Sequence, residues 1–492
     1  IAQNHNIGAM FVYSEEYWHT RSTGASRNDR IHPSTSEINA ALTNVQSNSG
    51  SSASEGLRSY IGRMNYSAYD KYLLEFRFRV DGSSKFIKGH QYGFFPTVAV
   101  GWRFTEEEFL KKYLSSWLSS GKLRASWGKL GDNSGVDRFE QLETLTAMNY
   151  MSSDVVKGFV NKKMINKDLS WEVSTDINVG LDLGFLNNRL RTEIDFYNRL
   201  RTGMNRPSQM SIHLTGAYSA PRANIGDLLN RGLELNLTWK DKIGNVEYSV
   251  NLNGAYNRTV LKEWNEFLSR GWVYLDMPYH FLYVYENNGI AQTWQDIYNN
   301  TPQGLSPGDV IRKDLNGDGI IDGKDKKAYP NIQRDRPTTT YGITLQATWK
   351  GFDISMLFNG GLGRKDFWLT DFNNTAFADR RYASTWDHWT EPWSLENRGG
   401  EWPRLGTSTD RSDNSYWLYN MNYLRMKNIM LGYNLPKKLL SKISMTNLRI
   451  YASAENLFTV TQYPGLDPEK KNSARDLYPI NRSFSIGLNV SF

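Results

Sequence analysis

The sequence predicts an all-β fold, a transmembrane antiparallel β-barrel with about 14 strands in this chain. Three observations support this prediction. Apolar and polar residues alternate with a period of two over segments of roughly 9 to 15 residues, the length that a tilted membrane strand needs. No stretch approaches the roughly 18 consecutive apolar residues of a membrane helix. Long and short connections alternate along the chain, as they do in outer-membrane barrels.

The clearest strand closes the sequence, where five apolar residues alternate with small polar ones from Phe484 to Phe492. This alternation places the two sets on opposite faces, one suited to lipid and the other to a wet lumen. Equally clear alternation predicts strands at 74–80, 172–185, 190–196, 233–239, 246–256, 343–349, 352–358 and 448–454. Weaker patterns predict strands at 5–17, 57–69, 92–104, 120–129 and 423–435.

The connections between these strands predict the orientation. With the C-terminus in the periplasm, the extracellular connections are residues 18–56, 82–91, 130–171, 199–229, 258–338, 362–422 and 459–481, and most are long. The periplasmic connections are residues 70–71, 105–119, 187–189, 241–245, 350–351 and 436–447, and four of them are tight turns. We expect a short amphipathic helix within 105–119 and a flexible loop at 43–56, which is rich in Ser, Asn and Gly.

Composition fits a barrel and excludes several other classes. Aromatic residues make up 13% of the chain, yet its mean hydropathy is -0.58, a combination that an apolar lipid face with a polar lumen and loops produces. The absence of cysteine excludes disulfides, thiolate zinc sites and cysteine nucleophiles. The net charge of +7 is scattered, and the Lys and Arg residues form no run of the kind that binds nucleic acid.

Several sequence blocks carry a resemblance to a known family. They are Tyr-Asp-Lys-Tyr-Leu-Leu at 69–74, Phe-Phe-Pro-Thr-Val-Ala-Val-Gly-Trp-Arg at 94–103, Lys-Leu-Arg-Ala-Ser-Trp-Gly-Lys-Leu-Gly at 122–131, Ala-Glu-Asn-Leu-Phe at 454–458 and Tyr-Pro-Gly-Leu-Asp-Pro-Glu at 463–469. In order and spacing the chain resembles the SusC/RagA family of TonB-dependent outer-membrane transporters. The resemblance covers most of the chain.

The resemblance implies a bacterial outer-membrane importer with a 22-stranded barrel, a plug, a SusD-like surface lipoprotein as a lid, and energy supplied through TonB. It begins partway into the barrel, so we expect this chain to be the C-terminal part of the barrel. We expect the plug, the TonB-contacting segment and the first strands to lie outside residues 1–492. In this family, Phe492 would also serve as the terminal aromatic signal for barrel assembly.

An acidic loop at 314–325 predicts a calcium site. Its oxygen-bearing side chains occupy positions 1, 3, 5, 9 and 12 of an EF-hand-type loop, a glycine lies at position 6, and a backbone carbonyl would serve at position 7. The predicted ligands are Asp314, Asn316, Asp318, Ile320 through its carbonyl, Asp322 and Asp325. The calcium would be structural. The alternative is an acidic turn without an ion, because Asp, Asn and Gly favour turns anyway.

Tryptophans in the two longest connections are the candidate substrate-binding residues, since flat apolar rings beside polar groups suit oligosaccharides or peptides. The candidates are Trp272, Trp294, Trp386, Trp389, Trp393 and Trp417. The alternative for each ring is packing within the loops or a place in the interfacial girdle.

The predicted function is TonB-dependent import of oligomeric nutrients, either glycans or peptides. The motifs of common hydrolases, zinc proteases and nucleotide-binding enzymes are absent from the sequence, so we do not expect an enzyme. Two alternatives remain open: a siderophore or metal-chelate receptor on the same kind of barrel, and a closed 14-strand barrel that acts as a passive pore or adhesin.

Overall fold

The structure is a computed structural model. It describes residues 4–29, 32, 34–41, 46–114, 117–151, 155–161, 163–215, 219–266, 274–279, 281–367, 391–404, 414–440, 445–470 and 480–491.

Fourteen strands form one antiparallel sheet, which we call the wall. In sheet order they are β1 (His5–Arg27), β2 (Gln46–Ala68), β3 (Tyr72–Ser83), β4 (Tyr92–Trp102), β5 (Leu118–Asp132), β8 (Glu172–Phe185), β9 (Leu190–Thr202), β12 (Asp227–Ile243), β13 (Val246–Glu263), β18 (Thr339–Trp349), β19 (Phe352–Leu362), β22 (Tyr423–Asn434), β23 (Asn447–Thr461) and β24 (Ser483–Ser491).

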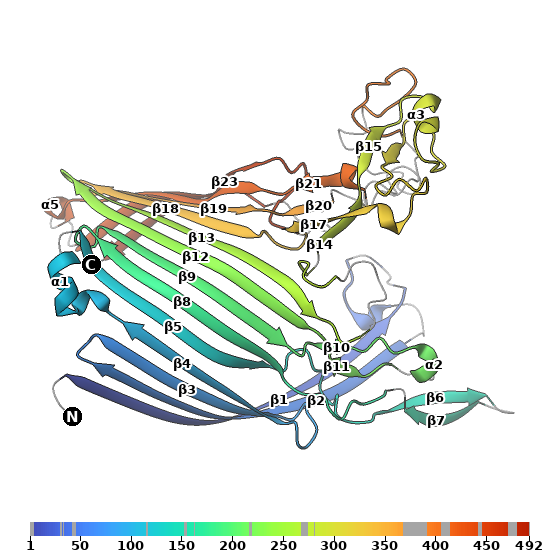
Figure 1. Ribbon diagram of the computed structural model, residues 1–492, viewed down its shortest axis with the longest axis horizontal. Helices are drawn as coiled ribbons and strands as arrows, with labels where there is room; N and C mark the ends of the chain where they lie inside the picture. The colour runs from blue at the N-terminus through green and yellow to red at the C-terminus, as the bar shows by residue number, and fades with distance from the viewer. Residues whose placement is uncertain are drawn as a thin grey trace.

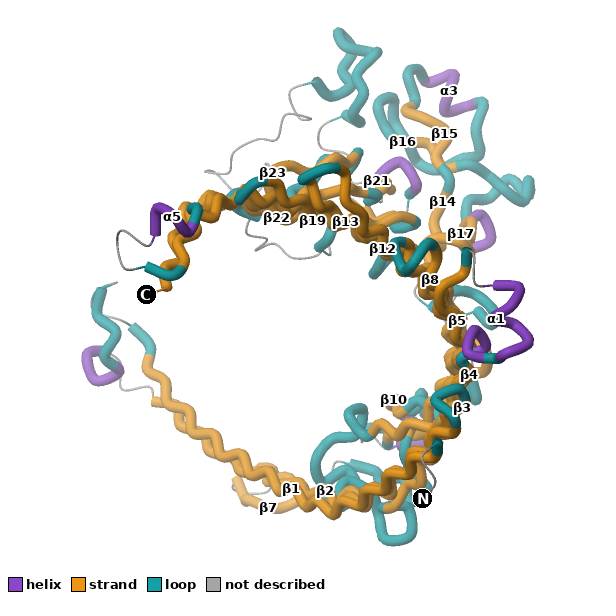
Figure 2. The backbone as a smooth tube through the Cα atoms, turned by 90° about the vertical axis from the view of Figure 1, so that its left-hand side faces the viewer, coloured by secondary structure: helices purple, strands orange, loops and turns teal. Residues whose placement is uncertain are grey.

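The wall is a meander in which each strand pairs with the wall strands that precede and follow it in the chain (Figure 1). It curves around a hollow interior without closing (Figure 2). Within the described residues, the outer edges of β1 and β24 pair with no other strand. The sheet therefore has two free edges.

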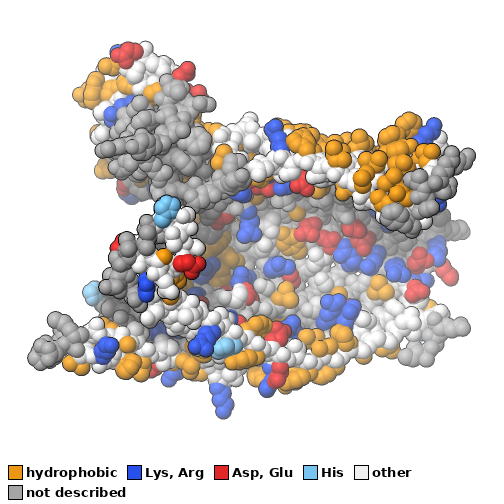
Figure 3. Space-filling model, turned by 180° about the vertical axis from the view of Figure 1, so that it is seen from behind, with side chains coloured by type: hydrophobic (Ala, Val, Ile, Leu, Met, Phe, Trp, Pro, Cys, Tyr) orange, Lys and Arg blue, Asp and Glu red, His pale blue; other side chains and the backbone are white. Residues whose placement is uncertain are grey.

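Side chains alternate between the two faces of the wall. On β3, Leu74 and Phe76 are exposed on the outer face, whereas Glu75 and Arg77 face the interior and form an ion pair there. Seen from behind, apolar side chains cover much of the outer surface, and acidic and basic side chains line the hollow (Figure 3). This division is what lipid outside and water inside require.

All fourteen predicted strands are present in the wall, at the predicted places in the chain. The prediction was wrong for residues 18–27 and 46–56, which continue β1 and β2 rather than forming parts of a loop. Ladder pairing runs from His5 with Ala68 to Arg27 with Gln46. Backbone hydrogen bonds extend the hairpin here, even though its small polar residues lack the apolar alternation of a wall strand.

The tight connections use left-handed backbone conformations. Lys350 and Gly351 join β18 to β19 with φ values of 46° and 92°, as a two-residue hairpin turn demands. Tyr69 and Asp70 join β2 to β3 in the same region of φ. The predicted helix in 105–119 is confirmed as α1, Glu108–Leu114.

The longer connections carry structure of their own, which the sequence analysis did not predict. Five small antiparallel sheets pair β6 (Leu145–Met151) with β7 (Val155–Asn161), β10 (Asn205–Pro207) with β11 (Arg222–Asn224), β14 (Phe281–Tyr285) with β17 (Lys326–Gln333), β15 (Asn287–Ile290) with β16 (Val310–Arg312), and β20 (Lys365–Phe367) with β21 (Leu418–Asn420). Short helices are α2 (Ile212–Thr215), α3 (Trp294–Tyr298) and α5 (Lys437–Leu440). The sheets of β14–β17 and β15–β16 and helix α3 project from one end of the wall (Figure 1).

A matched pair of substitutions on β18 tests the two faces of the wall. Leu345 pairs with Val250 on the outer face, and its neighbour Thr344 pairs with Asn251 on the inner face. We expect Leu345→Arg to lower the unfolding free energy by about 2 to 4 kcal/mol in a bilayer, because a cation then faces lipid near the midplane. We expect Thr344→Arg to cost much less. Urea unfolding of the complete protein in vesicles measures both, and equal costs would contradict the assignment of faces.

Candidate functional site

The inner face of the wall holds its charges in pairs. The guanidinium of Arg124 bridges two strands, with Nη2 2.7 Å from Asp182 Oδ1 and 2.8 Å from Asp195 Oδ2. Similar pairs join Arg63 to Glu75, Arg199 to Asp176, Arg201 to Glu172 and Arg449 to Asp353. Because opposite charges lie side by side, these parts of the lumen are polar without a strong field of one sign.

Amide and hydroxyl side chains predominate on the same face of β12 and β13, around the carboxylate of Glu234. Asn251 Nδ2 donates to Asn236 Oδ1 at 2.7 Å and to Thr238 Oγ1 at 2.8 Å. Further along β13, Asn257 Nδ2 donates to the hydroxyl of Tyr197 at 2.7 Å. Amide and hydroxyl groups both donate and accept hydrogen bonds. These side chains therefore suit contact with an uncharged polar molecule in the lumen.

Two connections fold back against the inner side of the wall near the ends of β3, β4 and β8. Phe86, Phe95, Val136, Leu169 and Trp171 form a buried apolar cluster there. Trp171 Nε1 donates to the Gln91 carbonyl at 2.9 Å. These contacts fix the two connections to the wall.

Arg364 holds three separate loops together. Its side chain is buried, and its N–H groups donate at 3.0 Å to the backbone carbonyls of Arg334, Pro468 and Lys470. Asp366 lies 3.8 Å from the same guanidinium and also pairs with Arg334. Burial lowers the pKa of Arg364, and the ring of carbonyls replaces the water that the cation has lost.

A second buried ion pair ties this assembly to the wall. Arg425 on β22 donates to Asp467 at 2.8 Å, and both side chains are almost completely buried. Glu469, two residues further on, pairs with Arg425 and with Lys427. The segment 467–470 is therefore fixed from two sides, by Arg425 and by Arg364.

The acidic loop at 314–325 is closed by hydrogen bonds to its own backbone. Asp314 accepts from the N–H of Gly317 at 2.7 Å and of Gly319 at 2.9 Å. Asp325 is completely buried and accepts from the N–H groups of Asp322 and Leu315. The bond from Asp322 is the main cause that lowers the pKa of Asp325.

Some of the predicted calcium ligands contact other side chains of the loop. Asn316 Nδ2 donates to Asp318 Oδ2 at 2.9 Å, and Lys324 lies 3.9 Å from both Asp318 and Asp322. In the part of the chain that the structure describes, no three His, Asp or Glu side chains are grouped as around a metal ion. The residues present are hard oxygen donors of the right kind, so calcium binding stays a prediction from the sequence.

Only three of the six candidate tryptophans lie within the described residues. Trp294 on α3 is 57% exposed. Trp393 is buried and donates from Nε1 to Gln292 Oε1 at 2.9 Å. Trp417 is buried in a cluster with Leu282 and Phe367. Trp272, Trp386, Trp389 and the predicted assembly signal Phe492 lie outside the described residues.

The tryptophan rings do not form one surface in this structure. Trp393 and Trp417 support the packing of the loops, and Trp294 is the described candidate with a free face. The partly buried side chain of Tyr283 has a similar supporting role, since its hydroxyl donates to the Gly323 carbonyl at 2.9 Å. Burial raises the pKa of Tyr283 to about 12, so the hydroxyl keeps its proton at neutral pH.

None of the helices in the described ranges is long and apolar enough to cross a membrane.

Sequence reasoning missed Arg364, Arg425 and Asp467. The three residues lie far apart in the chain, and only the pairing of β19, β22 and β23 brings them together. The available signals were the Tyr-Pro-Gly-Leu-Asp-Pro-Glu block at 463–469 and the Asn-Tyr-Leu-Arg-Met-Lys-Asn-Ile block at 422–429. Both indicated the family resemblance and not a contact.

Comparisons with known proteins agree with this architecture. Residues 3–457 match the family model described as TonB dependent receptor-like, beta-barrel. The chain is 30% identical over 476 residues to TonB-dependent receptor P3 of Formosa agariphila, covering 89% of this chain and 45% of that protein. It is also 30% identical over 456 residues to TonB-dependent receptor SusC of Bacteroides thetaiotaomicron, covering 89% of this chain and 44% of that protein.

Among solved structures, the RagAB peptide transporter superimposes with a TM-score of 0.82 at 23% identity, over 100% of this chain and 54% of that chain. At this identity the likeness concerns the fold. The chain spans less than half the length of the two receptors named above.

Removal of the buried cation should loosen the loops. We expect Arg364→Met to increase amide hydrogen exchange at residues 364–367 and 463–470, because at least three backbone carbonyls lose their donor. Breaking a buried charged contact typically costs about 3 to 5 kcal/mol. Arg189→Met is the matched control, since Arg189 is exposed in a surface pair with Asp241 and such pairs contribute about 0 to 1 kcal/mol. Unchanged exchange at both segments would contradict the role of Arg364.

Calcium binding can be tested on the loop itself. We expect added calcium to slow hydrogen exchange at residues 314–325 in the complete protein, and the double substitution of Asp314 and Asp318 by Ala to abolish this effect. Asp276→Ala, which removes an exposed carboxylate elsewhere in the same connection, should leave it intact. A parent protein whose loop shows no response to calcium would refute the prediction.

Proposed function

The chain belongs to the TonB-dependent receptor β-barrel family, and on that premise we propose that it forms the C-terminal wall of an outer-membrane importer. The importer would take up oligomeric nutrients, either peptides or glycans. It would be a transporter and not an enzyme, as expected for this family. Loops at the long-connection end would capture the nutrient, and the polar lumen would let it pass.

The observation that carries this proposal is an amphipathic wall with two free edges. An open sheet edge is not tolerated in lipid, because each unpaired N–H or C=O costs several kcal/mol (about 2 to 7). Strands β1 and β24 would thus require further strands to complete the cylinder. We infer a barrel of 22 strands with a plug inside, as the family resemblance implies.

A closed barrel made of these fourteen strands alone would need β1 to pair with β24. Their outer edges are unpaired across the described residues, which weighs against the passive pore or adhesin. Among the residues that the structure describes, neither the wall nor its loops carries a feature that favours a siderophore receptor.

We infer that the long connections are extracellular and that the C-terminus is periplasmic. The support is the alternation of long and short connections along the chain. The long connections, which follow β5, β9, β13, β19 and β23, lie at one end of the wall, and the tight turns lie at the other end (Figure 1). Outer-membrane barrels keep their short turns in the periplasm. The loops that Arg364 joins would then stand at the cell surface.

The proposed partners follow from the same premise. A SusD-like lipoprotein would cover the extracellular end, and TonB would deliver energy through a part of the protein outside residues 1–492. The structural relative named as a peptide transporter supports peptides as one substrate class. The amide side chains of β12 and β13 would suit peptide bonds or sugar hydroxyls alike, because both exchange hydrogen bonds without charge.

Uptake in cells that express the complete protein tests the proposal. We expect labelled oligopeptides or oligosaccharides to enter the periplasm in a manner that requires this protein and the proton-motive force. Deletion of its gene should abolish uptake of one of the two classes, and restoration of the gene should return it. Single amino acids and monosaccharides serve as the control, since general porins admit them. Uptake that persists after a protonophore, or that is lost for neither class of oligomer, would contradict the proposal.

A further inference from the structure

Helix α1 (Glu108–Leu114) lies at the end of the molecule where the tight turns join the strands (Figure 1) and outside the curve of the wall (Figure 2). It belongs to the connection between β4 and β5. At the same end, two residues suffice to join β18 to β19. The connection between β4 and β5 is therefore longer than strand pairing requires, and α1 is an addition to the wall.

The segment that leads into α1 is fixed to the outer face of the wall. Phe104 lies over Gly121 of β5, since a Cβ at Gly121 would be 2.3 Å from Cζ of Phe104. Gly121 is in step with Leu123, which pairs with Trp102, so alternation places it on the outer face. The buried hydroxyl of Thr105 accepts from the N–H of Gly121 at 2.9 Å. The chain thus leaves β4 and crosses the lipid side of β5.

Glu107 fixes the start of α1 to two rings of the outer face. Its side chain is buried. Its Oε1 accepts from the hydroxyl of Tyr72 at 2.6 Å and from Nε1 of Trp102 at 3.1 Å. Tyr72 and Trp102 pair with each other at the ends of β3 and β4. One carboxylate therefore joins the helix to the aromatic border of the wall.

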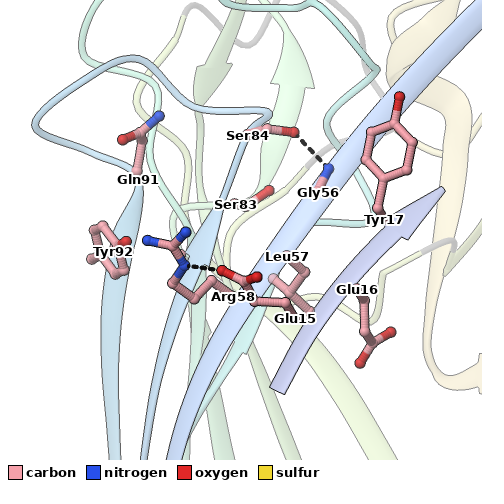
Figure 4. Close-up of a pocket in the computed structure, with 11 residues that line it drawn as sticks. Glu15, Glu16, Tyr17, Gly56, Leu57, Arg58, Ser83, Ser84, Gln91 and Tyr92 are labelled. Atoms are coloured by element: carbon pink, nitrogen blue, oxygen red, sulfur yellow. Dashed lines mark hydrogen bonds and ion pairs between the residues drawn. The ribbon is translucent and has the colours of Figure 1, made fainter. Parts of the chain in front are cut away.

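The depth of that border follows from β3. Tyr72 begins the strand, and Gly82, ten residues further on, pairs with Arg58 of β2. On the same outer face, Arg58 Nε lies 2.6 Å from Glu15 Oε1 (Figure 4). A tilted membrane strand needs about 9 to 11 residues, and charged side chains avoid hydrocarbon. The ion pair therefore marks one border of the hydrocarbon layer and Tyr72 the other, so α1 begins at the lipid–water interface.

Large apolar rings on and after α1 are exposed. Phe109 is 64% exposed, Tyr113 75% and Trp117 51%. Phe109 and Tyr113 are four residues apart and therefore share one side of the helix. Lys111 lies two residues from each of them and projects to the opposite side. The helix is thus amphipathic, with an aromatic side and a charged side.

The aromatic side is continuous with the lipid-facing surface of the wall. Trp117 stacks on Phe185 at the end of β8, with ring centroids 5.7 Å apart. Phe185 pairs with Leu118 and is in step with Leu183, so alternation places this stack on the outer face. The exposed rings of α1 therefore extend the apolar outer surface past the ends of the strands.

We propose that α1 is an interfacial anchor that binds the surface of a phospholipid leaflet, with the rings of Phe109 and Tyr113 inserted between the lipid head groups. Amphipathic helices with aromatic residues on the apolar side lie in such interfaces. Residues 103–117 contain three basic residues and three glutamates, so this segment has no net charge and fits zwitterionic lipid. Aromatic anchors help to set the tilt of membrane-spanning segments, and α1 would do so for β4 and β5.

Only the choice of leaflet rests on the orientation proposed above, which makes it the periplasmic leaflet. The contact with lipid rests on the contacts of residues 104–117 with the outer face. The two parts of the inference therefore need separate measurements.

Spin labels on single introduced cysteines test the contact in the complete transporter, reconstituted in phosphatidylcholine vesicles. Residues 1–492 contain no cysteine, and the parent protein serves as the labelling blank. We expect labels at Phe109→Cys and Tyr113→Cys to be more accessible to oxygen, which concentrates in lipid, than to a water-soluble nickel chelate. Lys111→Cys is the matched control on the charged side and should show the reverse.

Two results would overturn the anchor. A preference for the nickel chelate at all three positions would place α1 in water. Dipolar broadening between labels at Tyr113→Cys would place its aromatic side against a second copy of the chain. Because each of these side chains is exposed, either aromatic position can replace the other if one variant fails to fold.

The leaflet is tested in intact cells with a bulky, membrane-impermeant maleimide. Lys111→Cys should stay unmodified until the outer membrane is permeabilised. Asp276→Cys, at an exposed position in a long connection, is the control and should react in intact cells. Modification of Lys111→Cys in intact cells would overturn the periplasmic assignment and the proposed orientation. Neither measurement depends on uptake, so its failure is distinct from failure of the proposed substrate class.

Discussion

Backbone hydrogen bonding in a medium without water is the constraint on which the rest of this structure depends. Every N–H and C=O of a strand in lipid must find a partner in the adjacent strand. The fourteen wall strands meet this demand by pairing in sequence order. Side-chain alternation then follows, because one face of such a sheet meets lipid and the other meets the lumen. The tight turns and the long connections are the two ways of joining neighbours at opposite ends.

The loops lie beyond the wall, where water can satisfy backbone groups, and other interactions stabilise them. There the protein uses small sheets, three small apolar clusters and buried charges. Arg364 is the clearest case, since a single cation satisfies carbonyls from loops that are distant in sequence. The strands of the wall determine where each loop begins and ends. The buried charged groups fix the loops relative to one another. A nutrient would thus meet a surface that is set by both.

The wall could be predicted from the sequence, because alternation with a period of two is a local signal that lipid enforces. Strands such as 172–185 and 190–196 were located closely for that reason. The continuation of β2 into residues 46–56 was not predicted, since its serines and glycines face water on both sides and carry no pattern. Contacts such as Arg425 with Asp467 depend on strand register and loop path, which no local pattern encodes. The fit of Asp314–Asp325 to a calcium loop was visible only as a motif, and its carboxylates are engaged with the backbone.

The order of pairing in the wall has a consequence for how such proteins diversify. Because each strand pairs with its neighbours in sequence, the entropy of closing a loop is the only cost that a longer connection adds to the wall. That cost grows slowly, by about 0.6 kcal/mol for each doubling of loop length. Insertions between β13 and β18, or between β19 and β22, therefore lower the stability of the wall only slightly. Variation can accumulate in the connections at one end of the molecule, while the hydrogen-bonded wall stays the same.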